Sequence, residues 1–159
     1  MEEQFLFTDG SVDMKSGTGF GAYLYLSDPE VPIEFLKKKV KVKRFESTSS
    51  TKLELQTLLW ALRDISLSGK RITIYTDSQN ITGLLKRRER LGKRNFSSKK
   101  GRRIKNEELY REFFRITYAL NCEFKKVTGH QPSKQKDAIH RLFTLVDRAS
   151  RSAMRKNTP

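Results

Sequence analysis

The stretch FLFTDGS, residues 5–11, decides the fold, because an apolar run typical of a β-strand stops there on an acid and a glycine. Asp9 is therefore expected at the end of a strand, where its carboxylate is presented to solvent or to a metal ion. Asp and Gly also close strands as ordinary turn residues. The stretch alone leaves both interpretations open.

Three later acids also lie within or against apolar sequence: Glu54 in TKLEL, Asp77 directly after ITIYT, and Asp147 in LVDRASR. Each has a purely structural interpretation. Glu54 fits a capping box with Thr51 as the N-cap. Asp77 fits a helix N-cap, and Asp147 fits an i,i+4 ion pair with Arg151.

Chain length and net charge indicate the size of the domain and the kind of partner it binds. A chain of 159 residues has the size of one domain, here residues 1–159, and can bury a core without a metal or disulfide staple. Its 33 Lys and Arg against 18 acids give a net charge of +15. Such an excess indicates a polyanionic partner, with nucleic acid ahead of an anionic membrane.

Cysteine usage and the N-terminus bear on location. The single Cys122 cannot form an internal disulfide, which is compatible with a reducing compartment. Together with His130 and His140 it makes too small a set for a zinc site. The start MEEQ is not basic, and the apolar run after it is too short for a signal peptide or a membrane span. We therefore expect a cytoplasmic monomer that does not contact membranes.

Hydrophobic periodicity predicts an α/β fold. Strands are expected at residues 5–9, 20–26, 72–76 and 122–127, and helices at 55–65 (ended by Gly69), 77–85, 109–120 and 142–153. Residues 33–45 have the pattern of an extended outer strand with a bulge, whose lysines would protect a sheet edge.

The basic arm, residues 86–105, is the main electrostatic feature of the chain. It carries eleven Lys and Arg residues against one acid, Glu89. A solvated loop would explain this composition, but the density of charge, interleaved with Leu91 and Phe96, favours phosphate binding.

The four acids are more informative together than singly. Carboxylates packed together raise one another's pKa unless cations neutralise them. Oxygen-only ligation suits Mg²⁺ or Mn²⁺. Two such ions about 3.5–4 Å apart can hold an attacking water and a leaving oxygen around one phosphodiester.

An ordered set of motifs, TDGS (8–11), LEL (53–55), YTDSQ (75–79), VTGH (127–130) and VDRASR (146–151), resembles type 1 ribonuclease H over nearly the whole chain. The resemblance implies a ribonuclease H-like fold: a mixed five-stranded sheet, with strands one to three antiparallel, flanked by helices. It also implies an endonuclease that cleaves the RNA strand of RNA·DNA hybrids and leaves 5′-phosphate and 3′-hydroxyl ends. Because the first expected strand begins almost at once, we expect no separate hybrid-binding module before Phe5.

The resemblance also assigns roles to individual residues. Asp9, Glu54, Asp77 and Asp147 correspond to the metal-binding acids, with Asp9 as the bridging ligand of two Mg²⁺ ions, and His130 to a histidine that assists turnover. The basic arm corresponds to a substrate-binding protrusion, with Lys86, Arg87, Arg88 and Leu91 in place of the family's tryptophans. The residues expected to bind substrate are Gly10, Ser11, Lys15, Ser49, Ser50, Thr51, Gln79, Arg87, Arg88, Lys99, Lys100, Arg102, Arg103 and Asn106.

Two other functions remain open at this stage. The chain could be a related nuclease that acts on duplex DNA, which the carboxylates alone do not exclude. It could also be a non-catalytic nucleic-acid-binding module, but carboxylates beside a polyanion weaken binding unless metal occupies them.

Overall fold

The computed structural model describes residues 3–65, 69–97, 101–102, 104–128 and 137–157. The strands in these ranges are β1 (Glu3–Asp13), β2 (Thr18–Leu26), β3 (Lys41–Phe45), β4 (Arg71–Thr76) and β5 (Asn121–Lys126). The helices are α1 (Ile33–Leu36), the 3-10 helix η1 (Lys37–Lys39), α2 (Ser50–Asp64), α3 (Gln79–Lys93), α4 (Glu107–Tyr118) and α5 (Ala138–Asn157).

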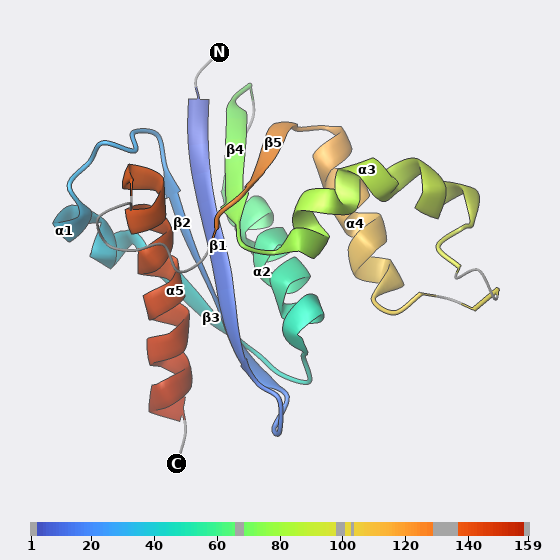
Figure 1. Cartoon of the computed structure of the whole chain (residues 1–159), viewed down its shortest axis with the longest axis horizontal. Coiled ribbons are helices and arrows are strands. Elements are labelled where there is room, and N and C mark those ends of the chain that lie inside the picture. Colours follow the sequence, from blue (N-terminus) through green and yellow to red (C-terminus); the bar gives the residue numbers. More distant parts are fainter. Residues whose placement is uncertain (1–2, 66–68, 98–100, 103, 129–136, 158–159) are drawn as a thin grey trace.

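The strands form one mixed sheet in the order β3-β2-β1-β4-β5 (Figure 1). β2 is antiparallel to both β1 and β3. β4 is parallel to both β1 and β5. This topology confirms the fold expected from the sequence, including the antiparallel arrangement of the first three strands.

Helices cover both faces of the sheet, and successive side chains of β1 point to opposite faces. Phe7 is fully buried in the core beneath α5, together with Val146. Leu6 is fully buried in the core on the other face, with Leu58 of α2 and residues of α4. α3 extends away from the sheet at one side of the molecule (Figure 1). None of the described helices has the length and apolar character needed to cross a membrane.

Glycines let α2 lie directly on the β1–β2 pair. A Cβ at Gly10 would be 2.9 Å from the Leu53 side chain, and a Cβ at Gly21 would be 2.1 Å from Thr57 Oγ1. Real Cβ atoms do not approach this closely, so these positions have no room for a side chain. The close approach brings the first turns of α2, and with them Glu54, next to the strand that carries Asp9.

The expectation of an extended segment at residues 33–45 is wrong for its first half. Residues 33–39 form α1 and η1, and only Lys41–Phe45 is a strand. A helical turn buries Leu36, which is 1% exposed, against the core beneath α5. Lys41 and Lys43 do lie on an outer strand, since β3 is at the sheet edge, whereas Lys37, Lys38 and Lys39 form η1.

Three expected helix boundaries also differ. α2 begins one residue after Ser49, whose side chain accepts the backbone N–H of Lys52, so Thr51 is not the N-cap and the capping box does not form. α2 ends at Asp64, well before Gly69. α3 continues to Lys93 because residues 86–93 are mostly strong helix formers.

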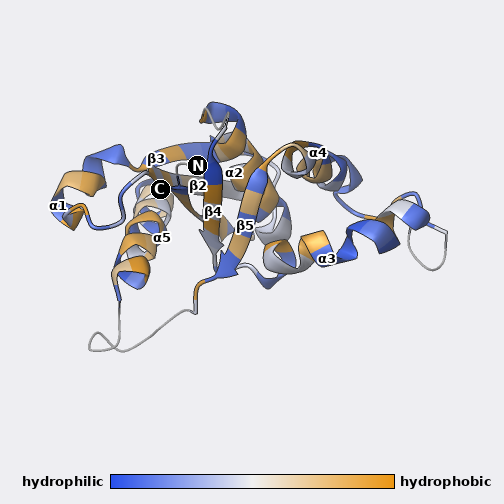
Figure 2. Ribbon diagram, turned by 90° about the horizontal axis from the view of Figure 1, so that it is seen from above, coloured by the Kyte–Doolittle hydropathy of each residue, from blue (hydrophilic) through white to orange (hydrophobic). Residues whose placement is uncertain are grey.

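The first half of the basic arm is therefore helical rather than a loop. Figure 2 shows the apolar residues of α3 in its first turns and hydrophilic residues at its far end. An i,i+4 ion pair between Glu89 and Lys93, at 3.2 Å, fits this helical segment. The positive charges are thus presented by a regular element.

Candidate active site

Asp9 and Asp77 are brought together by the parallel pairing of β1 and β4. Phe7 lies opposite Tyr75 in the register, and each acid comes two residues later in its chain. Because side chains two residues apart share a face of a strand, both carboxylates are directed to the side on which α5 packs. The parallel pairing thus brings two members of the candidate site together, and Asp77 follows the end of β4. The expected strand end at Asp9 is wrong, because β1 continues to Asp13 and Asp9 pairs with Ala22 of β2.

Asp147 reaches the same place from α5. This helix packs on β1 and β2, and Asp147 lies next to Val146, which is fully buried in the core beneath it. Asp147 Oδ1 also accepts from Arg151 Nε at 3.0 Å, so the predicted i,i+4 ion pair is confirmed. The ion pair does not remove Asp147 from the cluster, because its carboxyl still interacts with those of Asp9 and Asp77.

The electrostatics join the four acids into one cluster. Burial, followed by the negative charge of Asp77 and smaller effects of Asp147, raises the pKa of Asp9 to about 8. Loss of hydration at its carboxyl, and then Asp147, raise the pKa of Asp77. Burial, and to a lesser degree Asp77, raise the pKa of Glu54. The charges of Asp77 and Asp147 thus disfavour ionisation of neighbouring acids, which is the behaviour of carboxylates that lack a counter-ion.

Ser78 is a contributor that the sequence did not single out. Its Oγ donates a hydrogen bond to Glu54 Oε2 at 2.6 Å and accepts one from the backbone N–H of Ile81 at 3.2 Å. Ser78, rather than Asp77, is therefore the N-cap of α3. The available signal was a Ser directly before a helix, a position where its hydroxyl is expected to have a partner.

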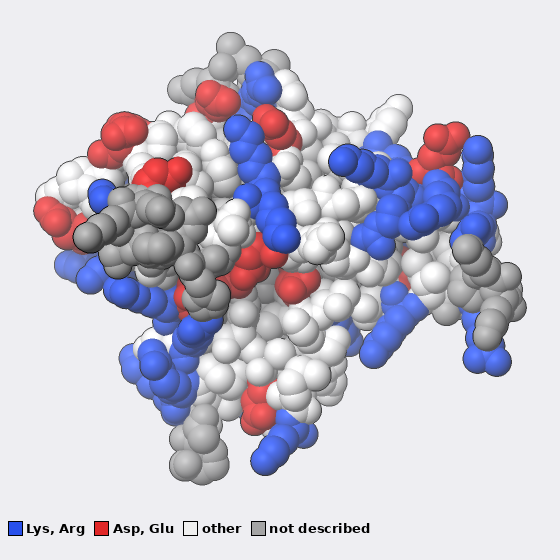
Figure 3. Space-filling model, viewed as in Figure 1, with Lys and Arg blue, Asp and Glu red and all other residues white. Residues whose placement is uncertain are grey.

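Two cations also act on the site. Lys126 and Arg151 each oppose the rise in the pKa of Asp77. Lys126 lies beside Thr76 in the β4–β5 register, one residue before Asp77, and the sequence analysis did not name it. Figure 3 shows acidic side chains near the centre of one face, with Lys and Arg on several sides of them.

The carboxylate oxygens of the four acids suit a hard divalent cation, although the side chains are spaced too widely to coordinate one as they stand. The four acids offer only oxygen, which suits Mg²⁺ or Mn²⁺. Within the described ranges, no three His, Cys, Asp or Glu side chains are gathered closely enough to hold an ion. Glu54 and Asp147 are held by their contacts with Ser78 and Arg151.

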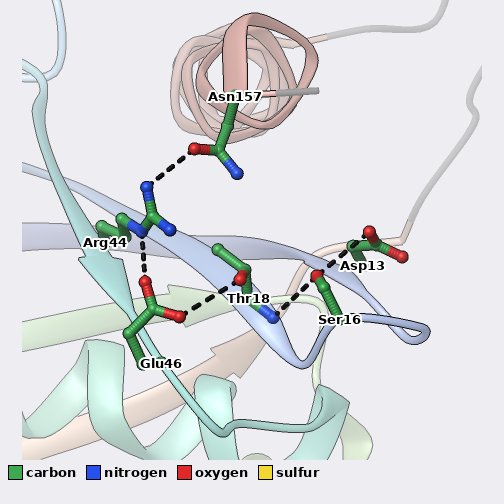
Figure 4. A network of polar contacts seen from close by, with 6 residues as sticks. All are labelled: Asp13, Ser16, Thr18, Arg44, Glu46 and Asn157. Atoms are coloured by element: carbon green, nitrogen blue, oxygen red, sulfur yellow. Dashed lines mark hydrogen bonds and ion pairs between the residues drawn. The ribbon is translucent and has the colours of Figure 1, made fainter. Parts of the chain in front are cut away.

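The β1–β2 hairpin carries Gly10, Ser11 and Lys15 of the expected substrate-binding set. Lys15 is exposed at its tip. The hairpin is fixed by a polar network that runs from Asp13 through Ser16, Thr18, Glu46 and Arg44 to Asn157 at the end of α5 (Figure 4).

The remaining expected residues occupy several elements. Ser50, Thr51 and Gln79 are exposed at helix starts, whereas the Ser49 side chain is engaged as a cap. Asn106 has a left-handed backbone, with φ of 66°, and precedes α4. Arg87 donates to Asn80 Oδ1 at 2.6 Å, and Arg88 donates to Thr117 Oγ1 at 3.1 Å. Arg102 is exposed, while His130, Lys99, Lys100 and Arg103 lie outside the described residues.

The RNase H family profile matches residues 1–145. The chain belongs to the ribonuclease H family. It is accordingly a nuclease of the class that hydrolyses the RNA strand of RNA·DNA hybrids. Three of the four acids fall inside the matched segment, and Asp147 lies two residues beyond it.

Two curated relatives have the same family name. A ribonuclease H of Neorickettsia sennetsu is 25% identical over 143 residues, which cover 89% of this chain and 91% of the relative. A ribonuclease H of Moorella thermoacetica is 27% identical over 162 aligned positions, which cover 98% of this chain and 96% of the relative.

Solved structures agree with the fold. The solution structure of the PFV RNase H domain has a TM-score of 0.74 at 14% identity and covers 94% of this chain and 92% of its own. LC9-RNase H1, described as a type 1 RNase H with the type 2 active-site motif, has a TM-score of 0.71 at 18% identity, covering 99% and 74%.

Proposed function

We propose that this ribonuclease H cleaves hybrid RNA at the cluster of Asp9, Glu54, Asp77 and Asp147, with two Mg²⁺ ions (or Mn²⁺) held by these carboxylates. The observation that carries the proposal is the pKa of Asp9, which burial and neighbouring charge raise to about 8. A carboxyl held in this way becomes an anion at neutral pH only when positive charge is supplied. Asp9, at the centre of the cluster, is the proposed bridging ligand.

The bound ions would supply the positive charge that neutralises the carboxylates and polarises the attacking water and the leaving oxygen. Ser78 orients Glu54 through its 2.6 Å hydrogen bond. Arg151 holds Asp147 on its side of the site. These contacts let the acids keep their places while they are charged.

The products follow from which bond breaks. The water oxygen forms a bond to phosphorus, the bond from phosphorus to the 3′-oxygen breaks, and a proton from water is passed to that oxygen. One fragment then ends in a 3′-hydroxyl and the other begins with a 5′-phosphate. We assign assistance with this proton, or with release of the phosphate, to His130.

Substrate contacts are proposed on both sides of the acids. Gly10, Ser11 and Lys15 lie on one side, and Ser50, Thr51 and Gln79 lie at the helix starts beside Glu54 and Asp77. Arg87, the rest of the basic arm and Asn106 are assigned to the DNA strand. Support comes from the net charge of +15 and from the projection of α3 beyond the sheet (Figure 1).

We further propose that residues 1–159 act as one domain and one monomer in a reducing compartment such as the cytoplasm.

A gel with labelled duplexes tests the proposal. RNA·DNA, RNA·RNA and DNA·DNA duplexes of one sequence are incubated with the protein in Mg²⁺, in Mn²⁺ or in EDTA. We expect cleavage of only the RNA strand of the hybrid, dependent on metal, with 3′-hydroxyl ends that a polymerase extends. Equal cleavage of DNA·DNA, or activity in EDTA, would contradict the proposal.

A further inference from the structure

A groove between α3 and α4 combines exposed cations with aromatic rings. It has a volume of about 490 Å³ and is lined by Arg88, Phe96, Arg111, Phe114, Arg115 and Tyr118. Phe96 and Phe114 are each 8% exposed and form its floor, with ring centroids 6.0 Å apart. Tyr118 is 82% exposed at the end of α4. The groove thus places one exposed ring, that of Tyr118, beside positive charge and an aromatic floor.

The arginines of this groove already lie against its rings. The Arg111 guanidinium carbon is 4.2 Å from the centroid of Phe96. That of Arg88 is 5.4 Å from Phe114 and 6.0 Å from Tyr118. Arg88 Nε is buried and has no hydrogen-bond partner among the described residues. Its guanidinium therefore keeps hydrogen-bonding capacity beside a stacking surface.

The backbone also holds Phe96 in an uncommon conformation. Asn95 and Phe96 both have positive φ, 50° and 59°, which is unfavourable for an aromatic residue. Phe96 donates its backbone N–H to Leu91 O and accepts from Ile104, so its position is fixed from both sides. Strain of this kind is found where a side chain must be held for use.

We propose that this groove binds the bases of single-stranded DNA that leaves the catalytic site. The inference rests on the proposed function, because hydrolysis of the RNA strand leaves the DNA strand intact and unpaired. Aromatic rings stack on any base, and arginines attract the backbone phosphates. Arg88 belongs to α3, whose other Lys and Arg residues supply further positive charge for the same strand.

The distance to the acids sets the length of DNA required. Tyr118 precedes β5, while Asp77 follows β4 at the far end of the parallel pair. A six-residue strand spans about 20 Å at about 3.3 Å per residue. Stacked DNA at about 3.4 Å per nucleotide covers that distance with about six nucleotides. An overhang of about ten nucleotides therefore reaches both sites.

The test measures binding of a fluorescent single-stranded DNA of this length in EDTA, so that cleavage plays no part. The variants are Tyr118→Ala and Arg115→Gln, neither of which changes the proposed catalytic or hybrid-binding residues. Phe35→Ala is the matched control for loss of an exposed ring, since Phe35 is 64% exposed on α1. Arg63→Gln is the matched control for Arg115→Gln, because Arg63 and Arg115 both pair with Glu112.

We expect Tyr118→Ala to weaken binding about 5-fold or more, the low end for loss of one stacked base. Arg115→Gln should weaken it more than Arg63→Gln, and Phe35→Ala should bind as wild type does. An abasic strand should bind wild type less tightly and be insensitive to Tyr118→Ala. Cleavage of a blunt hybrid should be unchanged in both groove variants. Loss of cleavage in wild type would count against the proposed function and leave this binding measurement intact.

Wild-type affinity in Tyr118→Ala would overturn the inference, as would equal binding of the abasic and normal strands. A polyglutamate peptide that competes with the DNA and depends equally on Tyr118 would also overturn it, because the groove would then select acidic protein segments.

Discussion

Ser78 Oγ lies 2.6 Å from Glu54 Oε2 and donates a hydrogen bond to it. The same oxygen caps α3 by accepting from Ile81. One hydroxyl thus ties a proposed metal ligand on α2 to the start of the helix that carries the basic arm. The position of Glu54 is therefore coupled to the position of α3 through the Ser78 side chain.

Ser78→Ala removes this hydrogen bond and should weaken the binding of Mg²⁺ at the acids. The hydrogen bond lowers the pKa of Glu54 against the effect of burial, so its loss raises that pKa and reduces affinity for Mg²⁺. Loss of the cap should also cost about 1 kcal/mol of stability. Cleavage titrated with Mg²⁺ should show a higher midpoint for Ser78→Ala and a near-normal one for Ser78→Thr, which keeps the hydroxyl. An unchanged midpoint in Ser78→Ala would remove Ser78 from the site.

The metal-free protein should lose stability as pH rises. The pKa of Asp9 is raised from 3.8 to about 8 in the folded state, so the folded protein binds more protons than the unfolded chain between these values. Stability therefore falls from about pH 4 to about pH 8. We expect a loss of at least about 1 kcal/mol, the equivalent of one pKa unit.

Urea unfolding in EDTA at several pH values measures this slope. Asp9→Asn should flatten it and be more stable than wild type at pH 8. Added Mg²⁺ should stabilise wild type most at the high-pH end and have little effect on Asp9→Asn. A wild-type slope that matches that of Asp9→Asn would show that Asp9 is not held in its neutral form.

Gly21→Ala should destabilise the fold by about 1–3 kcal/mol, the usual cost of overpacking, because the new Cβ would lie 2.1 Å from Thr57 Oγ1. Adding Thr57→Ala should recover part of the loss. Gly83→Ala is the matched control, since nothing lies within 4 Å of a Cβ there, and a helical Gly replaced by Ala should gain about 0.5–1 kcal/mol. Thermal unfolding of the four proteins measures these differences, and equal effects at the two glycines would contradict the close packing of α2.

Charge on α3 should set the salt dependence of hybrid binding. Replacing Arg87, Arg90 and Lys93 by Gln should reduce the log–log slope by as much as about 0.9 per lost phosphate contact, if values for B-DNA apply. The same change at Lys37, Lys38 and Lys39 of η1, on the other side of the sheet, is the control. Equal slopes in the two triple variants would show that α3 acts only through net charge.

Much of the fold was predictable because local sequence and tertiary structure agree. The short apolar runs of β1 and β4 and the apolar stripe of α2 each predicted an element of the right type. Residues 33–39 misled, because a short helical turn that buries Leu36 cannot be distinguished from a strand by spacing alone. The extent of α3 was missed because a dense basic sequence was taken for a loop.

The four acids of the candidate site were predictable from the sequence, but the residues that contact them or shift their pKa values were not. Asp9 lies within β1 and Asp77 directly follows β4, so their proximity is a consequence of the parallel pairing of these strands. The bond from Ser78 to Glu54 depends on how α2 and α3 are packed, which no local pattern contains. Lys126 likewise becomes a neighbour of Asp77 only through the β4–β5 register. The prediction for His130 lies outside the described residues.

The central claim is tested most directly by single-turnover cleavage of an RNA·DNA hybrid in saturating Mg²⁺ by wild type, Asp9→Asn and Asp13→Asn. Asp13 is an exposed acid at the end of the same strand and serves as the matched control. The account predicts that Asp9→Asn stays folded, binds the hybrid and cleaves at least about 100-fold more slowly, since the bound ions lower the activation barrier by several kcal/mol. Asp13→Asn should cleave at the wild-type rate. A folded Asp9→Asn that cleaves at a near wild-type rate would contradict it.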